Sequence, residues 1–493
     1  MTTVEEDKEA WTVASFEFLI QHEKFNDEER FILEAFRGQI LSKTSNVASF
    51  SPKIDILKST VKEVFEPVNA IVKRLTYPKS SPIINSNIAS KKVKVIFYPW
   101  LNMHVDFFQN TFLRLKNKGV KSVVFSNNYS IQERLHSLEP VLFDSYECIK
   151  ETKKLRKAKI NILKKSRDIP SFKVGNNHLL FDRLLTEVFE LFPRFLETVS
   201  SFNQLLKHFP NTKLILVGYD ITLVGRTICC LAQKHEIRTA TIQHGSNQST
   251  LLKYSIADYN FVFGNYFKNV LDTIAVNNVE VIAVGSPKFE HYFDESYRDQ
   301  TLKSLDFIKT KNPFLVALSG TGHSISEKNH IATIAVLKKV VTLRDKQHFI
   351  FKLHPKDDKR YYEGLIEHEN VTVVSRDHRC FEEFEFAEWI KICKGLITGA
   401  SAAAFEAFIL KKNVISVDLL GEIKGASFIS EGVSYHCQSL EDVIHALDSI
   451  ISKDRRYSQK SDAIEVYVKD KFRADGNPPS KKIADVIEQI ILT

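Results

Sequence analysis

The chain has 493 residues, and its 43% hydrophobic and 26% charged content is that of a soluble globular protein with two or three domains. A formal net charge of +8 at pH 7 favours anionic partners: nucleotides, phosphorylated acceptors, anionic lipids or nucleic acid. No apolar run reaches the ~18–20 residues needed to span a bilayer, so no membrane-spanning helix is predicted.

The first residues predict a helical region without chemistry of its own. Residues 1–75 carry apolar side chains at helical spacing, for example Phe31, Ile32 and Phe36. The segment 76–92 is rich in Ser, Pro and Asn and is predicted to be a linker. The acidic start lacks the apolar core of a signal peptide, and six scattered cysteines show no CxxC spacing. Together these features predict a cytoplasmic, reduced protein.

Residues 93–292 are predicted to form a Rossmann-like domain. Buried-strand runs alternate with helical segments, which is the pattern of a parallel sheet with right-handed crossovers. The loop after the first strand is expected to contact an acceptor. The runs are KVKVIFYP (92–99), KSVVFS (121–126), KLILVG (213–218), IRTATIQ (237–243), DYNFVFG (258–264) and VEVIAVGSPK (279–288), and the acceptor-binding candidates are Asn102, His104 and Asp106.

A strongly basic segment interrupts this domain at residues 149–167, IKETKKLRKAKINILKKSR. One interpretation is a helix that lies on an anionic membrane surface and places the protein at the inner face of the membrane. The other is a solvated helix with a narrow apolar stripe. No aromatic residues are interleaved with the charges, which argues against a nucleic-acid-binding segment.

A second α/β series fills residues 312–458, after a charged connection. Its strand runs are PFLVALSGTGH (313–323), HFIFKLHP (348–355), NVTVVS (370–375), KGLITGAS (394–401) and NVISVD (413–418). The pattern predicts a second Rossmann-like domain. Residues 459–493 end in an amphipathic helix that is expected to cross back to the first domain.

Three stretches of the second domain carry groups suited to a phosphate. The strand FIFK ends in Lys352, followed by His354 and Pro355. Because the carboxyl end of a parallel strand faces the ligand crevice, an ammonium and an imidazole are delivered there. The SGTGH turn allows close backbone approach to an anion. Its candidates are Gly320, Thr321 and Gly322.

The third stretch is LITGASAAAFEAF, where small residues open a helix. The hydroxyl of Ser401 and nearby N–H groups can bind phosphate oxygens, and Glu406 can accept from ribose hydroxyls; the alternative is an N-cap serine on a helix packed through alanines. The donor-binding candidates here are Thr398, Gly399, Ser401 and Glu406.

The catalytic candidates end two strands of the first domain. Asp220 suits a general base for an acceptor hydroxyl or a nucleophile, and its alternative is a plain N-cap. His244 follows Gln243 at the end of the next strand, facing the same crevice. No Asp-x-Asp pair or His/Cys cluster has metal-ligand spacing, so no metal and no other cofactor is predicted.

These motifs give the chain a resemblance to a known set of enzymes. The run LILVGYD…TIQHGS, with FKLHPKDD and ITGASAAAFEAF, resembles bacterial cell-surface polysaccharide glycosyltransferases of the histidine–proline motif type. That set includes Kdo transferases of capsule and lipopolysaccharide biosynthesis, polysialyltransferases and CDP-glycerol transferases. The acidic motif typical of sialyltransferases is not evident.

The resemblance implies a GT-B architecture, with the acceptor on the first domain and the donor on the second. It implies transfer of a sugar from a CMP-sugar such as CMP-Kdo to a surface polysaccharide or glycolipid. By the same resemblance, His354 and Ser401 contact donor phosphate and Asp220 is catalytic. Three alternatives stay open: a CDP-glycerol-type polyol-phosphate transferase, a UDP-sugar 2-epimerase and a non-catalytic GT-B scaffold.

Overall fold

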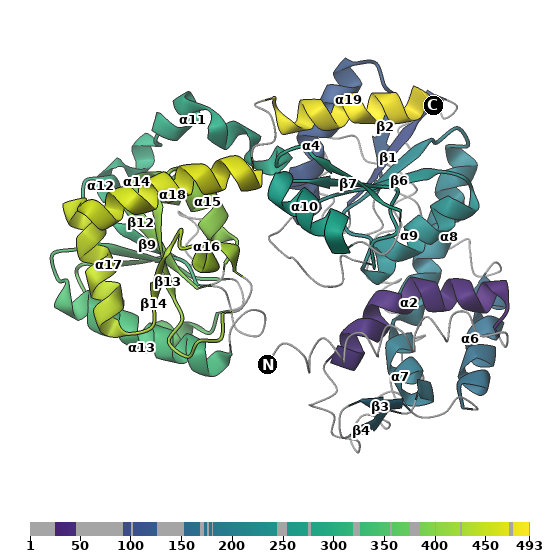
Figure 1. Ribbon diagram of the computed structural model, residues 1–493, viewed down its shortest axis with the longest axis horizontal. Helices are drawn as coiled ribbons and strands as arrows, with labels where there is room; N and C mark the ends of the chain where they lie inside the picture. Colours follow the sequence, from purple (N-terminus) through teal and green to yellow (C-terminus); the bar gives the residue numbers. More distant parts are fainter. Residues whose placement is uncertain are drawn as a thin grey trace, which may run out of the picture.

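The chain forms two α/β halves, each built on a six-stranded parallel sheet (Figure 1). This confirms the predicted α/β class with two parallel sheets. Most of the predicted helical N-terminal region and linker lies outside the described residues. The computed structural model describes residues 25–45, 92–99, 102–125, 152–167, 172–174, 177–179, 181–243, 254–274, 278–318, 326–354, 357–374, 384–399, 401–423, 426–472 and 477–492.

The first sheet has the strand order β2-β1-β5-β6-β7-β8. The chain runs outward from β1 to β2, and then returns to the other side of β1 with β5 and continues outward to β8. The direction of winding therefore reverses between β1 and β5. The strands are β1 (Val95–Tyr98), β2 (Ser122–Val124), β5 (Leu214–Val217), β6 (Arg238–Ile242), β7 (Tyr259–Val262) and β8 (Glu280–Ala283).

Helices cover both faces of this sheet because β1 is apolar on both sides. Val95 and Phe97 join the core cluster that contains α4, whereas Ile96 and Tyr98 join the cluster on the opposite face, with α2, α8 and α9. The bounds are α2 (Asp27–Ser45), α4 (Asn102–Asn117), α6 (Thr152–Ser166), α7 (Phe181–Val188), η6 (Phe189–Leu191), α8 (Phe192–His208), α9 (Leu223–Lys234) and α10 (Asn265–Ile274), with a small hairpin of β3 (Phe172–Val174) and β4 (Asn177–Leu179).

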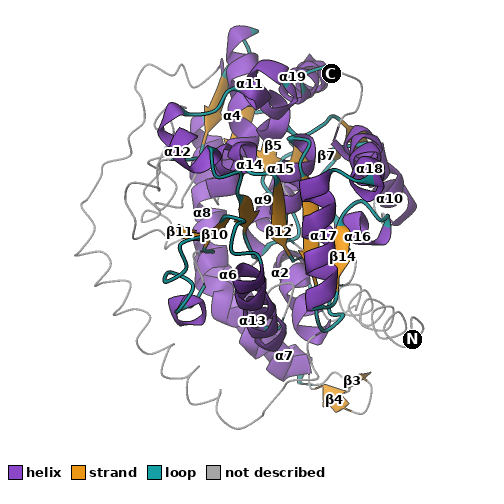
Figure 2. Cartoon of the chain, turned by 90° about the vertical axis from the view of Figure 1, so that its left-hand side faces the viewer, coloured by secondary structure: helices purple, strands orange, loops and turns teal. Residues whose placement is uncertain are grey.

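The second sheet has the order β11-β10-β9-β12-β13-β14, and its winding reverses between β9 and β12. Helices enclose the strands here too (Figure 2). The strands are β9 (Phe314–Val316), β10 (Phe349–Lys352), β11 (Val371–Val374), β12 (Gly395–Thr398), β13 (Asn413–Val417) and β14 (Tyr435–Cys437). The helices are α13 (Glu327–Leu343), η10 (Lys359–Tyr362), α14 (Phe386–Ile392), α15 (Ala403–Ile409), α16 (Ser427–Ser430), α17 (Leu440–Ser452) and α18 (Arg455–Phe472).

Two connections join the halves. The outgoing one contains η8 (Pro287–Phe293), α11 (Glu295–Asp299), η9 (Lys303–Leu305) and α12 (Asp306–Lys309). The returning one is the end of α18, where the ring of Phe472 lies 5.7 Å from that of Phe263 in the first half and 5.1 Å from that of Phe405 in the second. Beyond it, α19 (Pro479–Leu492) packs on α4 of the first half. Lys118, directly after α4, forms ion pairs with Asp485 (2.9 Å) and Glu488 (2.6 Å) of α19.

Candidate functional site

The predicted donor-binding segments follow three strands that are neighbours in the second sheet. The SGTGH segment follows β9, the histidine–proline turn follows β10, and the TGAS segment follows β12. In the sheet, β9 lies between β10 and β12, with parallel pairing on both sides. Because all three segments leave carboxyl ends, they emerge at one edge of the sheet. This edge includes the reversal between β9 and β12, the place where open α/β sheets bind ligands.

Thr398 and Ser401 hold the β12 end of this edge in shape. The buried hydroxyl of Thr398 donates to the carbonyl of Ala317 (2.6 Å), which ties the end of β12 to the segment after β9. The half-buried Ser401 accepts a hydrogen bond at Oγ from the N–H of Ala403 (3.2 Å), at the start of α15. Thr398 therefore bridges two strand ends, and Ser401 contacts the first turn of α15, whose N-cap residue is Ala402 and not Ser401. The donor-binding roles of both residues stay predictions.

The β10 turn is closed by a residue to which sequence reasoning gave no role. The backbone N–H of His354 donates to Oδ2 of Asp357 (2.9 Å), and the N–H of Asp357 donates back to the carbonyl of His354 (2.9 Å). Lys352 and His354 are both half-buried. The carboxylate of Asp357 thus fixes the backbone that carries the imidazole and the ammonium group. Pro355 lies outside the described residues.

Asp357 is itself buried in a small polar cluster behind the turn. Its Oδ2 also accepts from the hydroxyl of Tyr362 (2.9 Å), and its Oδ1 lies 3.7 Å from Nε2 of His330 on α13. Burial lowers the pKa of His330, against the opposing effect of the Asp357 charge, and burial followed by Asp357 raises the pKa of Tyr362. The cluster therefore favours a neutral imidazole and a protonated phenol around one buried carboxylate.

Two further carboxylates hold the start of α13, which follows the SGTGH sequence along the chain. Glu422 accepts from the N–H (2.8 Å) and hydroxyl (2.7 Å) of Ser326, the N-cap residue of α13. Asp418, buried at the end of β13, accepts from the side-chain amide of Asn329 (3.0 Å). These bonds fix where α13 begins. Gly320, Thr321 and Gly322 lie outside the described residues.

Glu406 contacts the connection between the halves. It is 8% exposed; its Oε1 accepts from Lys288 (3.0 Å) and its Oε2 from the hydroxyl of Tyr292 (3.1 Å), both in η8. Burial, and next the Glu406 carboxylate, raise the pKa of Tyr292. The interaction fixes α15 relative to η8. Glu406 was predicted to bind the donor, and that role stays a prediction. Its observed contacts are those with Lys288 and Tyr292.

In the first half, Asp220 is buried, and one of its carboxylate oxygens accepts three hydrogen bonds. Its side chain is 1% exposed, and Oδ2 accepts from the hydroxyl of Ser255 (2.6 Å), the N–H of Ile256 (2.7 Å) and the N–H of Ala257 (2.9 Å). The predicted N-cap belongs instead to Thr222, which accepts from the N–H of Gly225. These contacts make Asp220 an anchor for the segment before β7, and its catalytic role stays a prediction.

The loop predicted to carry His244 is anchored at both ends. At its start, the side chain of Gln243 accepts from the N–H of Phe263 (2.9 Å), beyond the end of β7. At its end, the Asp220 carboxylate holds residues 255–257, and the guanidinium of Arg226 donates to the carbonyl of Tyr254 (2.8 Å). His244 itself lies outside the described residues.

The three predicted acceptor-binding residues lie on a helix, and the prediction of a loop is wrong. Helix α4 begins at Asn102 and includes His104 and Asp106 in its first turns. His104 is 1% exposed, and its ring packs against Gly218 at the end of β5: a Cβ there would lie 2.0 Å from Nδ1. The contact lies where the winding of the first sheet reverses. His104 therefore packs against the end of β5, and its acceptor-binding role stays a prediction. Asp106 is half-buried.

The anchoring residues Asp357, Asp418, Glu422, Gln243 and Arg226 were missed by sequence reasoning. Asp418 and Gln243 carried a signal, because they directly follow β13 and β6, as Asp220 closely follows β5. The others depend on contacts between residues far apart in the sequence.

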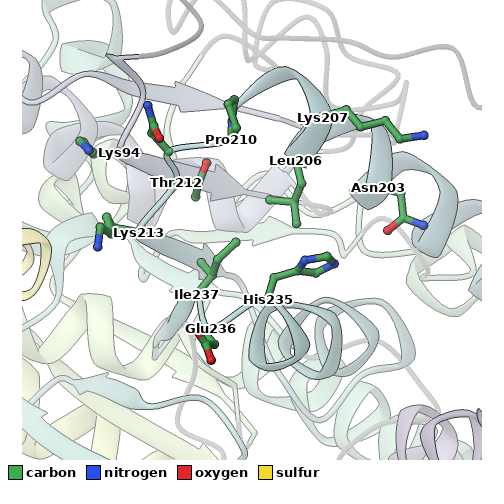
Figure 3. Close-up of a pocket in the computed structure, with 11 residues that line it drawn as sticks. Lys94, Asn203, Leu206, Lys207, Pro210, Thr212, Lys213, His235, Glu236 and Ile237 are labelled. Atoms are coloured by element: carbon green, nitrogen blue, oxygen red, sulfur yellow. The ribbon is translucent and has the colours of Figure 1, made fainter.

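Two cavities among the described residues lie away from this edge. The larger, of about 650 Å³, is lined by Lys94, Lys213, His235 and Ile237, among others (Figure 3). Lys94, Lys213 and Ile237 immediately precede β1, β5 and β6. The cavity therefore opens at the amino edge of the first sheet, opposite the predicted crevice, and contains none of the predicted site residues. The smaller, of about 340 Å³, is lined by residues of α2, α9 and the segment before β7.

No protein-family model and no curated protein matches the chain. Solved structures do match. The UDP-GlcNAc 2-epimerase of Methanocaldococcus jannaschii superposes with a TM-score of 0.54 at 13% identity, over 80% of this chain and 100% of its own. The chain has the GT-B fold. The UDP-GlcNAc 2-epimerase of Neisseria meningitidis gives 0.51 at 14% identity, over 81% and 100%. A glycosyltransferase of Rickettsia africae gives 0.50 at 14% identity, over 81% and 99%.

This GT-B chain is longer than the structures it matches. The whole of the M. jannaschii enzyme corresponds to 80% of it, so about a fifth of the chain is additional. Within the described residues, no helix is both long and apolar enough to cross a membrane. The same residues contain no group of three or more His, Cys, Asp or Glu arranged to hold a metal ion.

Proposed function

We propose that the chain is a metal-independent glycosyltransferase that moves a sugar from a nucleotide-activated donor to a glycan or glycolipid acceptor. The observation that carries the proposal is the strand order β10-β9-β12, because sequence segments with candidate phosphate-binding groups follow these three neighbouring strands. The resemblance to cell-surface polysaccharide glycosyltransferases and the GT-B fold support the same conclusion.

In this proposal the second half holds the donor's phosphates. The N-terminal end of α13 and the glycines before it supply N–H groups, and Ser401 supplies a hydroxyl. Lys352 and His354 stabilise the negative charge that grows on the leaving nucleotide as the bond from its phosphate oxygen to the sugar's anomeric carbon breaks. The turn held by Asp357 keeps these two groups in place before the reaction begins.

The first half presents the acceptor across the crevice. The new bond forms between an acceptor hydroxyl oxygen and the anomeric carbon, and the hydroxyl proton passes to a base. His244 is the proposed base, because it directly follows Gln243, whose side chain accepts from the N–H of Phe263 beyond the carboxyl end of β7. Asn102 and Asp106, on the first turns of α4, are proposed to contact the acceptor.

The nucleotide is tested by thermal denaturation of the full chain with CMP, CDP, UDP and GDP in turn. A ligand at about 100 times its Kd stabilises by roughly 2.7 kcal/mol, so a true ligand gives a clear rise in Tm. The resemblance favours a cytidine donor such as CMP-Kdo, and we expect a cytidine nucleotide to give the largest rise. A uridine or guanosine nucleotide in first place would contradict the cytidine assignment. No rise with any of the four would favour a scaffold.

The second candidate function is a nucleotide-sugar 2-epimerase. The UDP-GlcNAc 2-epimerases among the matching structures favour it. An epimerase converts UDP-GlcNAc without an acceptor, so incubation with UDP-GlcNAc alone separates the two. The proposal predicts no UDP-ManNAc. Its accumulation to an equilibrium mixture would replace the transferase with the epimerase, and transfer from CDP-glycerol to a polyol acceptor would identify the polyol-phosphate enzyme.

A further inference from the structure

Helix α6 presents an exposed face that is cationic along its whole length. Its fifteen residues include seven Lys or Arg and no Asp or Glu. Three of the seven are engaged with the first half: Lys154 with Glu28, Lys165 with Glu29 at 2.6 Å, and Lys159 over the Phe192 ring at 5.1 Å. The four that remain are exposed, and the exposed Arg167 directly follows the helix. They are Lys153, Arg156, Lys157 and Lys164.

These exposed cations share one side of the helix. At about 100° per residue, positions 153, 156, 157, 164 and 167 fall within an arc of roughly 100°. Ile160, which is 53% exposed, lies near the middle of that arc. The opposite side carries Ala158 and Ile162, both buried in the core with α2 and α7. Packing in the core explains the apolar residues on the inner side of α6. It does not explain the cations on the outer side.

Ordinary solvation is a poor explanation for this face. Solvated helix faces generally mix the two signs of charge, as α18 does, with Asp462, Glu465 and Asp470 among its cations. On α6 the repulsion between neighbouring cations is not relieved by any acidic residue of the helix itself. Figure 1 shows α6 at the edge of the first half, on the side away from the second sheet. The cationic face is thus accessible to a large flat partner.

We propose that this face of α6 docks the protein on an anionic lipid bilayer. Its charge complements an anionic leaflet, and Ile160 provides one apolar contact at its centre. The helix has no aromatic residue on which nucleic-acid bases could stack. Because the attraction comes mainly from four or five charges at the surface, binding is reversible and weakens with salt. The inference does not depend on the proposed function.

The test is co-sedimentation of the full chain with vesicles of phosphatidylcholine alone or mixed with phosphatidylglycerol. We expect binding only to the mixed vesicles, and loss of that binding at high salt. Each cation near an anionic surface contributes roughly a fivefold gain, so replacing Lys153, Arg156, Lys157 and Lys164 by Gln is expected to weaken binding by about 100-fold or more. Ile160→Ser is expected to weaken it by a few-fold.

A matched control carries the same loss of charge elsewhere. Lys328, Lys339, Lys346 and Lys469 are exposed residues of the second half, and their replacement by Gln is expected to leave binding within a few-fold of the unmodified chain. Equal loss in the control, or binding to phosphatidylcholine alone, would overturn the proposal. So would absence of binding to the mixed vesicles, whether or not the chain binds duplex DNA or RNA. Unchanged melting of the α6 variant shows that its fold is intact.

Discussion

Replacing Asp220 by Ala is expected to destabilise the chain by about 3–5 kcal/mol. The change removes a buried carboxylate oxygen that accepts from Ser255, Ile256 and Ala257, and leaves two backbone N–H groups and a hydroxyl without their partner. Asp220→Asn keeps an acceptor oxygen and is expected to cost about half as much. Urea denaturation measures both values.

The control for Asp220 is Asp272→Ala, which removes an exposed carboxylate paired with Lys268 one helical turn away. Its expected cost is below about 0.5 kcal/mol. The contrary result is an Asp220→Ala variant that is as stable as Asp272→Ala and still binds nucleotide, but loses transfer. In that case Asp220 is catalytic, and the anchoring role is wrong. If stability falls and transfer falls with it, Asp220 acts by positioning the loop that carries His244.

Replacing Glu34 by Ala is expected to destabilise the chain by about 2–4 kcal/mol, because it strands a buried positive charge. The Arg226 side chain is 1% exposed and forms its ion pair with Glu34 of α2. Its Nε also donates to the backbone carbonyl of Glu34 (3.0 Å). The pair fastens α2 to α9, and the same guanidinium holds the carbonyl of Tyr254. Equilibrium unfolding in urea is the measurement.

The double variant Glu34→Leu with Arg226→Met separates the cost of a stranded charge from the value of the pair. Removing both charges and keeping apolar volume is expected to recover most of the stability lost in Glu34→Ala. Glu295→Ala, at an 84% exposed side chain paired with Arg298, is expected to change stability by less than about 0.5 kcal/mol. A double variant less stable than Glu34→Ala would show that the pair stabilises the fold by more than its desolvation costs.

The fold was predictable from the sequence because its signals are local. Short apolar runs separated by helical segments identify parallel strands, and all the strand runs quoted from the sequence contain a strand of the two sheets. The strand order within each sheet was not predictable, since it depends on which distant strands pair. The start of α4 was misjudged because Asn102–Asp106 follows a proline-ended strand, where a loop is the usual expectation, and the helix begins at once.

The sequence predicted which chemical groups the candidate site contains, but not the contacts that each of them makes. Lys352, His354 and Ser401 were identified from strand ends, and the sheet order brings their segments to one edge. The sequence alone could not show whether Asp220 and Glu406 have a chemical role or a structural one. A carboxylate after a strand serves equally as base, cap or anchor, and only the partners Ser255–Ala257, Lys288 and Tyr292 distinguish among them.

The central claim is that the second half binds the nucleotide at the carboxyl ends of β9, β10 and β12. Amide hydrogen exchange of the full chain, with and without saturating concentrations of the nucleotide that gives the largest thermal shift, tests it most directly. The account predicts slowed exchange in peptides covering 317–326, 352–358 and 398–404, and unchanged exchange around Lys94 and Lys213. Protection confined to the first half, or centred on the cavity lined by Lys94 and Lys213, would contradict it.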